Sequence, residues 1–443
     1  RCTMKHLNKP LKKSYLLTPF LLLAFWFGSV HEAQSQKTVS KETKNFTEFK
    51  GKILDAQTSK ALVFATITIK GTNASTVSNA QGDFVLKVPN SLLKNTVEVS
   101  FLGYETLTKQ LDVKTSNAFN LALEPAAIAL NEVDLIIPKD AKTLVEETLA
   151  RKGENYFNSP TLMTAFYRET IKKRRKNVSL SEAVVSIYKS PYVSNRKDDV
   201  ALYKARKSTD YTKLDTLALK LQGGPFNTLY IDVMKYPEYL FSETYMDLYK
   251  FSYGAATRVN DQLVYVVNFE PRSYEGEPLF KGQLFIDVER KILTKAIFSM
   301  DLSNPKEAAR LFVKKKPKNA NVWPTEVAYR VDYREKDNKW YYGYSNLLLS
   351  FKIDWENKLF NSVYTLNCEM AITDWENTDR DQMPKRRDLL KTSMILTDEA
   401  IGFSDPDFWG NYNIIEPEKS IENAIKKIRK QLSKAKEKGV VNP

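Results

Sequence analysis

A two-residue alternation of apolar and polar side chains, running from Leu263 to Met370, limits the fold of this chain more than any other feature. Successive side chains of a β-strand point to opposite faces of its sheet, so this period predicts strands with one buried face and one wet face. Turn-rich segments at 335–339 and 356–358 separate the runs and predict hairpins. The pattern therefore predicts an antiparallel meander. The clearest alternating runs are Leu284–Val288, Val327–Tyr333 and Leu347–Trp355.

Residues 46–125 show the same period in shorter runs, separated by turn residues such as Gly71 and Gly82. About seven short strands in about 80 residues, without a helical period, predict a small β-sandwich. The runs are Val63–Ile69, Phe84–Val88, Val97–Phe101 and Phe119–Leu123. The sequence thus predicts a mainly β protein with a few helices, in which a β-sandwich precedes a larger antiparallel sheet domain.

Four strings within residues 46–125 resemble the carboxypeptidase-regulatory-like domain, a transthyretin-like sandwich found at the N-terminus of many exported and outer-membrane proteins. The strings are Gly51–Asp55, Ala65–Thr72, Gln81–Phe84 and Phe101–Tyr104. Ala61 and Leu62 stand where that family usually has Pro-Leu, a difference confined to a turn. The resemblance implies an accessory sandwich without a catalytic site, because the family name does not imply peptidase activity.

The following domain, residues 141–415, resembles the larger Gram-negative envelope proteins that carry this sandwich. The matching stretches are Asn155–Tyr156, Phe166–Glu169, Ser181–Ala183, Tyr188–Tyr192 and Phe408–Ile415. The rhythm of its strands, with Gly282–Asp287 and Trp323–Val327, is similar to the curved half-barrel of periplasmic lipoprotein carriers. These resemblances imply an architecture, either a half-barrel or another antiparallel sheet, and no chemistry.

Helical patterns flank the larger sheet domain. Asp140 and the apolar stripe after it predict a helix that ends near Gly153 and opens domain 141–415. Residues 126–140 are predicted to form a linker. At the other end, residues 416–443 predict a basic amphipathic helix and tail. Its apolar seam is expected to dock on the protein's own sheet or, alternatively, to bind a membrane interface or a partner.

The first 35 residues have the pattern of an export signal, because lysines precede an apolar run from Leu16 to Val30 and small residues follow it. We predict a signal peptide over residues 1–35, cleaved near Ser35, and a disordered lead-in over residues 36–45. A membrane anchor is the alternative, but the fifteen residues of this run are fewer than the roughly 20 that span a bilayer. The pattern predicts export to the periplasm or to the periplasmic face of the outer membrane.

Histidine and cysteine are nearly absent beyond that leader. Both histidines, His6 and His31, lie within residues 1–35, and Cys368 is the one cysteine that follows them. A mature chain without histidine has no Ser-His-Asp or Cys-His nucleophile system and lacks the commonest zinc ligands. Cys368 alternates in phase with Met370, which predicts a buried thiol. We therefore predict a protein that is not an enzyme, with no catalytic residue, no metal site and no cofactor.

Net charge bears on the choice of partner. The formal charge of +14 falls to +10 without residues 1–35, which carry five basic and one acidic side chain. In an exported chain this excess favours an envelope protein or an anionic lipid or glycan over nucleic acid, and peripheral over integral membrane association. Alternatively, the excess only keeps the surface solvated. Both interpretations apply to the basic clusters at 172–176, 314–318 and 385–387, which fall at predicted hairpin turns.

Aromatic residues concentrate between Tyr230 and Tyr253 and supply the candidate binding residues. Such side chains stack on sugars or line apolar grooves, and the alternative is ordinary core packing. The candidates are Tyr236, Tyr239, Phe241, Tyr245 and Tyr249.

Two functions from different classes fit these features. The first is a non-catalytic binding or scaffolding protein of the cell envelope, with the sandwich as an interaction module and the larger sheet as a lipid or glycan groove. The alternative is a carboxylate-dependent hydrolase of envelope glycans, which needs two carboxyl groups across a cleft and no histidine. An acidic cluster, Asp374, Glu376, Asp379 and Asp381, offers oxygen ligands for calcium, but Arg380 within it favours a charge-balanced loop.

Overall fold

A computed structural model describes residues 45–126, 140–209, 223–241, 243–259, 262–272, 276, 278–312, 319–356, 359–379, 386–402 and 407–418. The predicted signal peptide, most of the lead-in and linker, nearly all of the C-terminal helix and the basic cluster at 314–318 lie outside these residues. Within the described ranges, no helix is long and apolar enough to cross a membrane.

The predicted β-sandwich is confirmed, as two sheets with the strand orders β4-β1-β7 and β3-β2-β5-β6. Its strands are β1 (Phe46–Asp55), β2 (Thr66–Ile69), β3 (Ser75–Val77), β4 (Asp83–Pro89), β5 (Thr96–Ser100), β6 (Leu107–Gln110) and β7 (Leu121–Leu123). The 3-10 helices η1 (Asn90–Leu92) and η2 (Val113–Ala118) lie between strands. Apolar side chains such as Phe49, Ile67 and Val99 fill the core and are fully buried.

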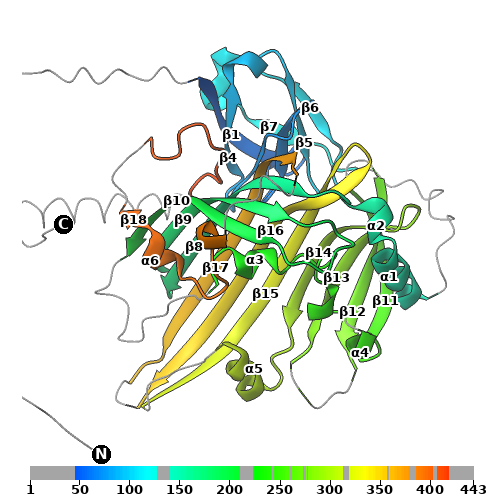
Figure 1. Cartoon of the computed structure of the whole chain (residues 1–443), viewed down its shortest axis with the longest axis vertical. Helices are drawn as coiled ribbons and strands as arrows, with labels where there is room; N and C mark the ends of the chain where they lie inside the picture. The colour runs from blue at the N-terminus through cyan, green and yellow to red at the C-terminus, as the bar shows by residue number, and fades with distance from the viewer. Residues whose placement is uncertain are drawn as a thin grey trace, which may run out of the picture. The chain divides into compact units, whose positions relative to one another are not determined.

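A second, larger sheet of eleven strands follows, in the order β11-β12-β13-β14-β15-β16-β17-β8-β9-β10-β18 (Figure 1). It is open, with β11 and β18 at its edges, and its neighbouring strands are antiparallel except β10 and β18. The prediction of a larger antiparallel sheet after the sandwich is confirmed. The strands are β8 (Thr161–Lys173), β9 (Lys176–Lys189), β10 (Asp199–Thr209), β11 (Tyr249–Val259), β12 (Gln262–Pro271), β13 (Phe280–Asp287), β14 (Ile292–Met300), β15 (Ala320–Lys336), β16 (Lys339–Trp355), β17 (Ser362–Asn377) and β18 (Ile401–Gly402).

Tight turns join the long strands where the sequence predicted them. Asp337 and Asn338 connect β15 to β16 with φ angles of 51° and 59°, as a two-residue turn with positive φ at both positions requires. β16 and β17 form the second predicted hairpin, with Ile353 paired to Ser362. The basic cluster at 172–176 forms the turn between β8 and β9.

Short helices lie between the strands. They are α1 (Ala141–Ala150), α2 (Lys152–Asn155), α3 (Phe226–Leu229), α4 (Glu243–Met246), α5 (Pro305–Phe312), α6 (Leu396–Glu399), η4 (Pro237–Tyr239) and η6 (Arg386–Asp388). The predicted opening helix is α1, whose first N–H groups bond to the Asp140 carboxylate. It ends at Ala150, and Gly153 lies in the separate turn of α2 rather than at its end.

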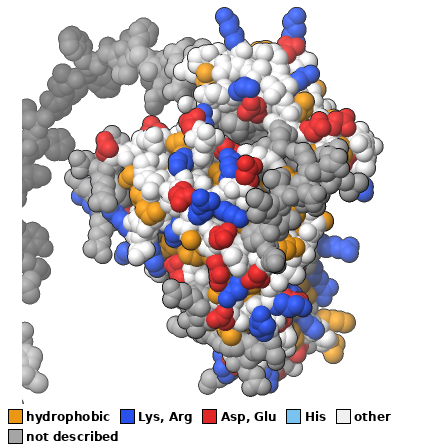
Figure 2. Space-filling model, turned by 90° about the vertical axis from the view of Figure 1, so that its right-hand side faces the viewer, with side chains coloured by type: hydrophobic (Ala, Val, Ile, Leu, Met, Phe, Trp, Pro, Cys, Tyr) orange, Lys and Arg blue, Asp and Glu red, His pale blue; other side chains and the backbone are white. Residues whose placement is uncertain are grey.

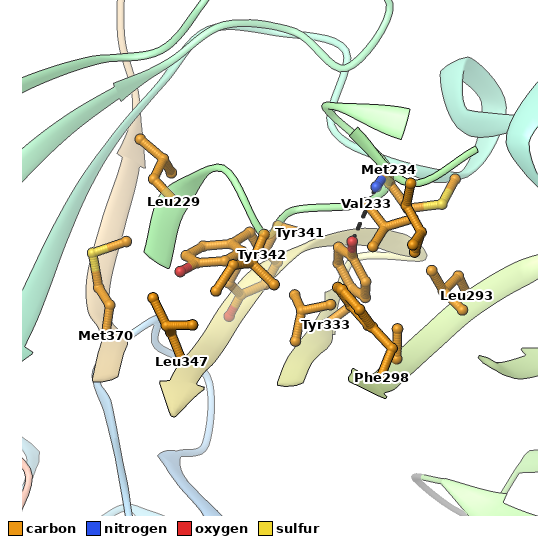
Figure 3. Close-up of a cluster of buried hydrophobic side chains, with 14 of the residues drawn as sticks. Leu229, Val233, Met234, Leu293, Phe298, Tyr333, Tyr341, Tyr342, Leu347 and Met370 are labelled. Atoms are coloured by element: carbon orange, nitrogen blue, oxygen red, sulfur yellow. Dashed lines mark hydrogen bonds between the residues drawn. The ribbon is translucent and has the colours of Figure 1, made fainter. Parts of the chain in front are cut away.

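One face of the large sheet, here called the helix face, is covered by α1, α3 and the segment after α3. In Figure 3, Leu229 of α3 and Val233 and Met234 of the segment after it point toward the strands. The Met234 N–H donates to Tyr333 Oη at 3.1 Å across the same contact. Ala308 of α5 packs into a second apolar cluster on this face, formed by β8, β9 and β14–β17.

The opposite face, here called the sandwich face, is covered in part by the sandwich. Val77 of β3 and Val85 of β4 pack with Phe166 and Tyr344 of the large sheet in one buried cluster. Side chains from residues 408–415 complete that cluster. The prediction of one wet face, made for residues 263–370, is therefore wrong for the part of β16 around Tyr344, because the sandwich and the 408–415 segment exclude water from it.

Candidate functional site

Hydrogen bonds reinforce the apolar contact between the sandwich and the sandwich face. Ser75 Oγ accepts from Arg334 Nη1 at 2.6 Å and donates to the Ile372 carbonyl at 3.2 Å. Thr76 Oγ1 donates to the Ile414 carbonyl at 2.9 Å. Both hydroxyl side chains are buried, and burial lowers the pKa of the Arg334 guanidinium. Loss of such a buried bond leaves an unsatisfied polar group, so these bonds favour one fixed position of the sandwich on the large sheet.

An ion network centred on Arg168 lies next to this contact. Arg168 is 2.7 Å from Glu182 and 3.1 Å from Glu369, and Arg206 is 2.8 Å from Glu182. Arg168 Nη2 also donates to the Ile415 carbonyl at 2.6 Å. Burial acts to lower the pKa of Arg168, but the two glutamates more than reverse this effect and keep the guanidinium charged. The pKa of Glu182 falls despite its burial, because it has two guanidinium neighbours.

The network joins stretches far apart in the sequence. Arg168, Glu182 and Ile415 belong to three of the stretches that resemble the larger envelope proteins, namely 166–169, 181–183 and 408–415. Arg168 and Glu369 are separated by 201 residues, so strand periodicity gives no signal for the pair. The resemblance was the only sequence signal that pointed to these positions.

A second buried network, centred on Lys189 at the end of β9, lies on the helix face. Its ammonium is 2.7 Å from Asp198 and 2.8 Å from Asp232. The hydroxyls of Tyr192 and Tyr333 donate to Asp232 at 3.1 and 2.9 Å. Burial acts to lower the pKa of Lys189, but the two aspartates raise it overall. The cluster therefore links β9, the segment after α3 and β15 through charge-assisted bonds.

A small cavity adjoins Lys189. Thr161, Tyr188, Ser194 and Arg196 are among its lining residues, and its volume is about 20 Å³. A space of that size holds about one water molecule. It is too small for a sugar ring or an acyl chain.

Glu169 differs from these paired carboxylates. It lies on the helix face with 7% of its surface exposed, and Tyr167 Oη donates to it at 3.1 Å. Burial raises the pKa of Glu169 to about 7, and the Tyr167 hydrogen bond opposes this rise. Ser181 is its partner across β8 and β9, and among the described residues Ser181 Oγ has no hydrogen-bond partner. The pair can offer hydrogen bonds, but both side chains are closed off from solvent.

The structure places three of the five aromatic candidates in the core. Tyr236, Phe241 and Tyr249 are between 1% and 5% exposed, whereas Tyr239 is 47% exposed. Tyr245 packs against the same core from a partly buried position. Phe241 and Tyr249 contact each other with ring centroids 5.7 Å apart, and Tyr236 Oη donates to Asp198 at 2.8 Å. The five candidates therefore do not form one open groove.

The carboxylates of the two buried networks are bridged by cations. Glu182 and Glu369 share Arg168, while Asp198 and Asp232 share Lys189. These side chains lie in the interior rather than across an open cleft.

The predicted acidic cluster lies at the end of β17. Asp374, Glu376 and Asp379 are exposed, and Asp381 falls outside the described residues. No group of histidine, cysteine, aspartate and glutamate side chains in the described part of the chain could hold a metal ion. Cys368 is buried, which confirms its predicted place in the core, and burial raises the pKa of its thiol.

The family comparison agrees with the sandwich. The model of the CarboxypepD_reg-like domain matches residues 49–135. The chain carries a CarboxypepD_reg-like domain. This domain is the β-sandwich that contributes Ser75 and Thr76 to the buried contact described above. None of the curated proteins matches the chain.

Likenesses to solved structures involve a larger share of the chain. A proposed outer membrane lipoprotein-sorting protein domain from Vibrio parahaemolyticus is 12% identical, with 56% of this chain and 95% of that chain covered and a TM-score of 0.24. A DUF1329 family protein from Desulfovibrio piger is 10% identical, with 56% of this chain and 96% of that chain covered and a TM-score of 0.23. Lipovitellin is 7% identical, with 57% of this chain and 28% of that chain covered and a TM-score of 0.26. TM-scores of this size do not establish a shared fold.

Proposed function

We propose that the protein is a non-catalytic scaffolding protein of the cell envelope, in which the CarboxypepD_reg-like domain is an interaction module held on a large, rigid sheet. The observation that carries this proposal is the buried contact between that domain and the sandwich face. The envelope location rests on the export signal that the sequence predicts over residues 1–35.

Further contacts, within the buried cluster of that contact and outside it, support a fixed arrangement. The rings of Phe64 and Tyr344 stack with centroids 4.8 Å apart, and the Arg330 guanidinium lies 4.9 Å from the centre of the Phe64 ring. Leu102, in the loop after β5, packs against Val266 and its neighbours on β12 and β13. The sandwich thus meets the large sheet at more than one place, which opposes independent rotation of the two.

The sandwich leaves an edge for a partner. β6 is the last strand of its sheet, and Thr108, Lys109 and Gln110 are exposed on it. An exposed edge strand presents unpaired backbone groups that can bond to a strand of another protein. This edge suits the role of an interaction module.

The alternative hydrolase has weaker support. That chemistry needs two carboxyl groups on either side of a substrate. The two buried carboxylate pairs described above are bridged by Arg168 and Lys189, and Glu169 has only Tyr167 as a hydrogen-bond partner among the described residues.

Two measurements on one preparation test the proposal. The processed protein, purified from envelopes, is incubated with peptidoglycan and lipopolysaccharide, and released fragments are measured by mass spectrometry. We expect no release, and glycan release that Glu169→Gln abolishes would overturn the proposal in favour of the hydrolase. In intact cells, a photo-reactive residue at position 108 on β6 should cross-link to an envelope component. The same residue at Asn321, an exposed position on β15, serves as the matched control.

A further inference from the structure

The hairpin between β16 and β17 ends in exposed apolar side chains. Leu359 is 98% exposed and Phe360 is 77% exposed, and Val363 nearby is 36% exposed. Single exposed apolar residues are common on protein surfaces. Two adjacent large ones this exposed at a turn have a hydration cost that folding does not relieve.

A basic turn lies beside this apolar tip. β17 pairs with β8, so that Tyr364 is opposite Lys173. The Arg174 N–H donates to the Val363 carbonyl at 2.8 Å, and its guanidinium donates to the Asn361 carbonyl at 3.4 Å. The turn of residues 172–176, a basic cluster in the sequence, is thus fixed against the hairpin that carries Leu359.

Cations outnumber anions around the tip. Arg174, Arg175 and Lys176 are exposed, and Lys352 of β16 is partly exposed. The acidic residues next to the tip are Asp354 of β16 and Glu356, which follows that strand. Lys172 is 3.9 Å from Glu418. The described residues here therefore keep a positive excess.

We propose that this end of the large sheet, formed by Leu359, Phe360 and the basic turn 172–176, docks on an anionic lipid surface. Exposed apolar side chains enter the interface between head groups and acyl chains, while lysine and arginine attract anionic head groups. The tip supplies both kinds of group side by side. This inference rests on the proposed envelope location and adds the surface that the scaffold meets.

Charge favours a membrane over a protein partner as the occupant. A tip of two apolar residues buries little area, and specific protein interfaces need about 1,200 Å² or more. An anionic bilayer needs no complementary shape, only charge and an apolar layer. On the face drawn in Figure 2, by contrast, basic and acidic side chains are interspersed.

Vesicle binding tests the proposal directly. The processed full chain is mixed with vesicles of phosphatidylglycerol and phosphatidylethanolamine in equal parts, and separately with phosphatidylcholine vesicles, and bound protein is measured by sedimentation. We expect binding to the anionic vesicles that weakens from about 0.1 M to about 1 M salt, as the Debye length shortens from about 10 Å to about 3 Å.

Matched variants assign that binding to the tip. Leu359→Ser with Phe360→Ser should weaken it at least about tenfold, since full burial of one large apolar side chain already corresponds to about that factor. Val113→Ser with Val193→Ser removes two other exposed apolar side chains and should leave it unchanged. Arg175→Gln with Lys176→Gln should weaken it, whereas Lys94→Gln with Lys114→Gln, in the sandwich, should not. Circular dichroism confirms that each variant is folded.

The outcomes separate this inference from the proposed function. Wild-type protein that does not bind anionic vesicles, or tip variants that bind as tightly as wild type, would overturn the inference. A tip that instead captures one protein, without vesicle binding, would replace lipid by a protein partner. In both cases the position-108 cross-link and the absence of glycan release are unaffected, so the scaffold proposal is judged separately.

Discussion

The sandwich and the large sheet differ in where their ion pairs lie. The sandwich has an apolar core, and its ion pairs, such as Lys70 with Glu98, lie on the surface. The large sheet buries Arg168 and Lys189 together with their carboxylate partners. In the sandwich two sheets cover each other with side chains alone. The large sheet is covered by irregular segments, whose backbone carbonyls need partners. The Ile415 carbonyl, for example, accepts a hydrogen bond from Arg168.

The largest expected effect on stability is that of Arg168→Met, which disrupts the buried network of the large sheet. It leaves Glu182 and Glu369 with one cation fewer in a buried site, so we expect a loss of about 3–5 kcal/mol in unfolding free energy. Lys70→Ala removes the exposed pair with Glu98 and should cost less than about 1 kcal/mol. Urea unfolding followed by tryptophan fluorescence measures both. Similar small losses for the two variants would show that the buried network does not stabilise the sheet.

Glu169→Gln tests the carboxyl group that the large sheet buries without a cation beside it. The folded carboxyl keeps its proton up to pH about 7, whereas the unfolded chain releases it above about 4.5. Stability of the wild type should therefore fall as pH rises between these values, by on the order of 3 kcal/mol. The variant should lack this slope. Urea midpoints at several pH values measure it, with Glu48→Gln in the sandwich as control. A slope retained in Glu169→Gln would contradict the assignment.

Ser75→Ala tests the contact that joins the two regions. It removes one acceptor from the buried Arg334 guanidinium, so we expect a loss of about 1–3 kcal/mol. Hydrogen exchange should rise in β3 and in the facing part of β17. Ser91→Ala, at an exposed position of η1, should change neither. Unchanged exchange in β3 would mean that the apolar cluster alone holds the sandwich.

Tyr104→Phe is expected to have the smallest effect and reverses the sign seen at Glu169. Tyr104 Oη donates to Asp55 at 2.5 Å, and this bond with backbone N–H groups lowers the pKa of Asp55 from its usual 3.8. The stabilising contribution of Asp55 is present above pH 3.8 and is lost as pH falls through the lower, folded pKa. Carboxyl NMR titration of the variant should give a higher pKa for Asp55. An unchanged value would assign the shift to the backbone bonds.

Sequence periodicity predicted the fold better than it predicted the interior of the large sheet. The alternation around Leu284 and Leu349 identified strands correctly, and the turn at Asp337 was recognisable from its residue types. A polar residue such as Glu369 has the same periodicity whether it faces water or a buried partner such as Arg168. The wet-face prediction failed there because alternation cannot show what covers a sheet.

The candidate site was predicted less well for a related reason. An aromatic cluster has the same composition in a core and in a groove, and the structure places Tyr236 and Tyr249 in the core. Lys189 and Asp232 meet only because the segment after α3 folds across the sheet. Such contacts depend on tertiary structure, which the spacing of residues does not report.

The strand order has a consequence for the time course of synthesis. β8 is made early, yet its neighbour on one side is β17, and Arg168 and Glu369 meet only when both strands are present. Contacts of such high sequence separation form slowly. Strands β8–β10 can pair with one another early and β11–β17 can pair in succession as hairpins, but the pairing of β8 with β17 must wait until β17 is present. The contact between the sandwich and the large sheet is completed later still, because Thr76 of the sandwich bonds to Ile414. Assembly therefore finishes with the C-terminal residues. A chain that ends before residue 414 would lack the hydrogen bond between Thr76 of the sandwich and Ile414.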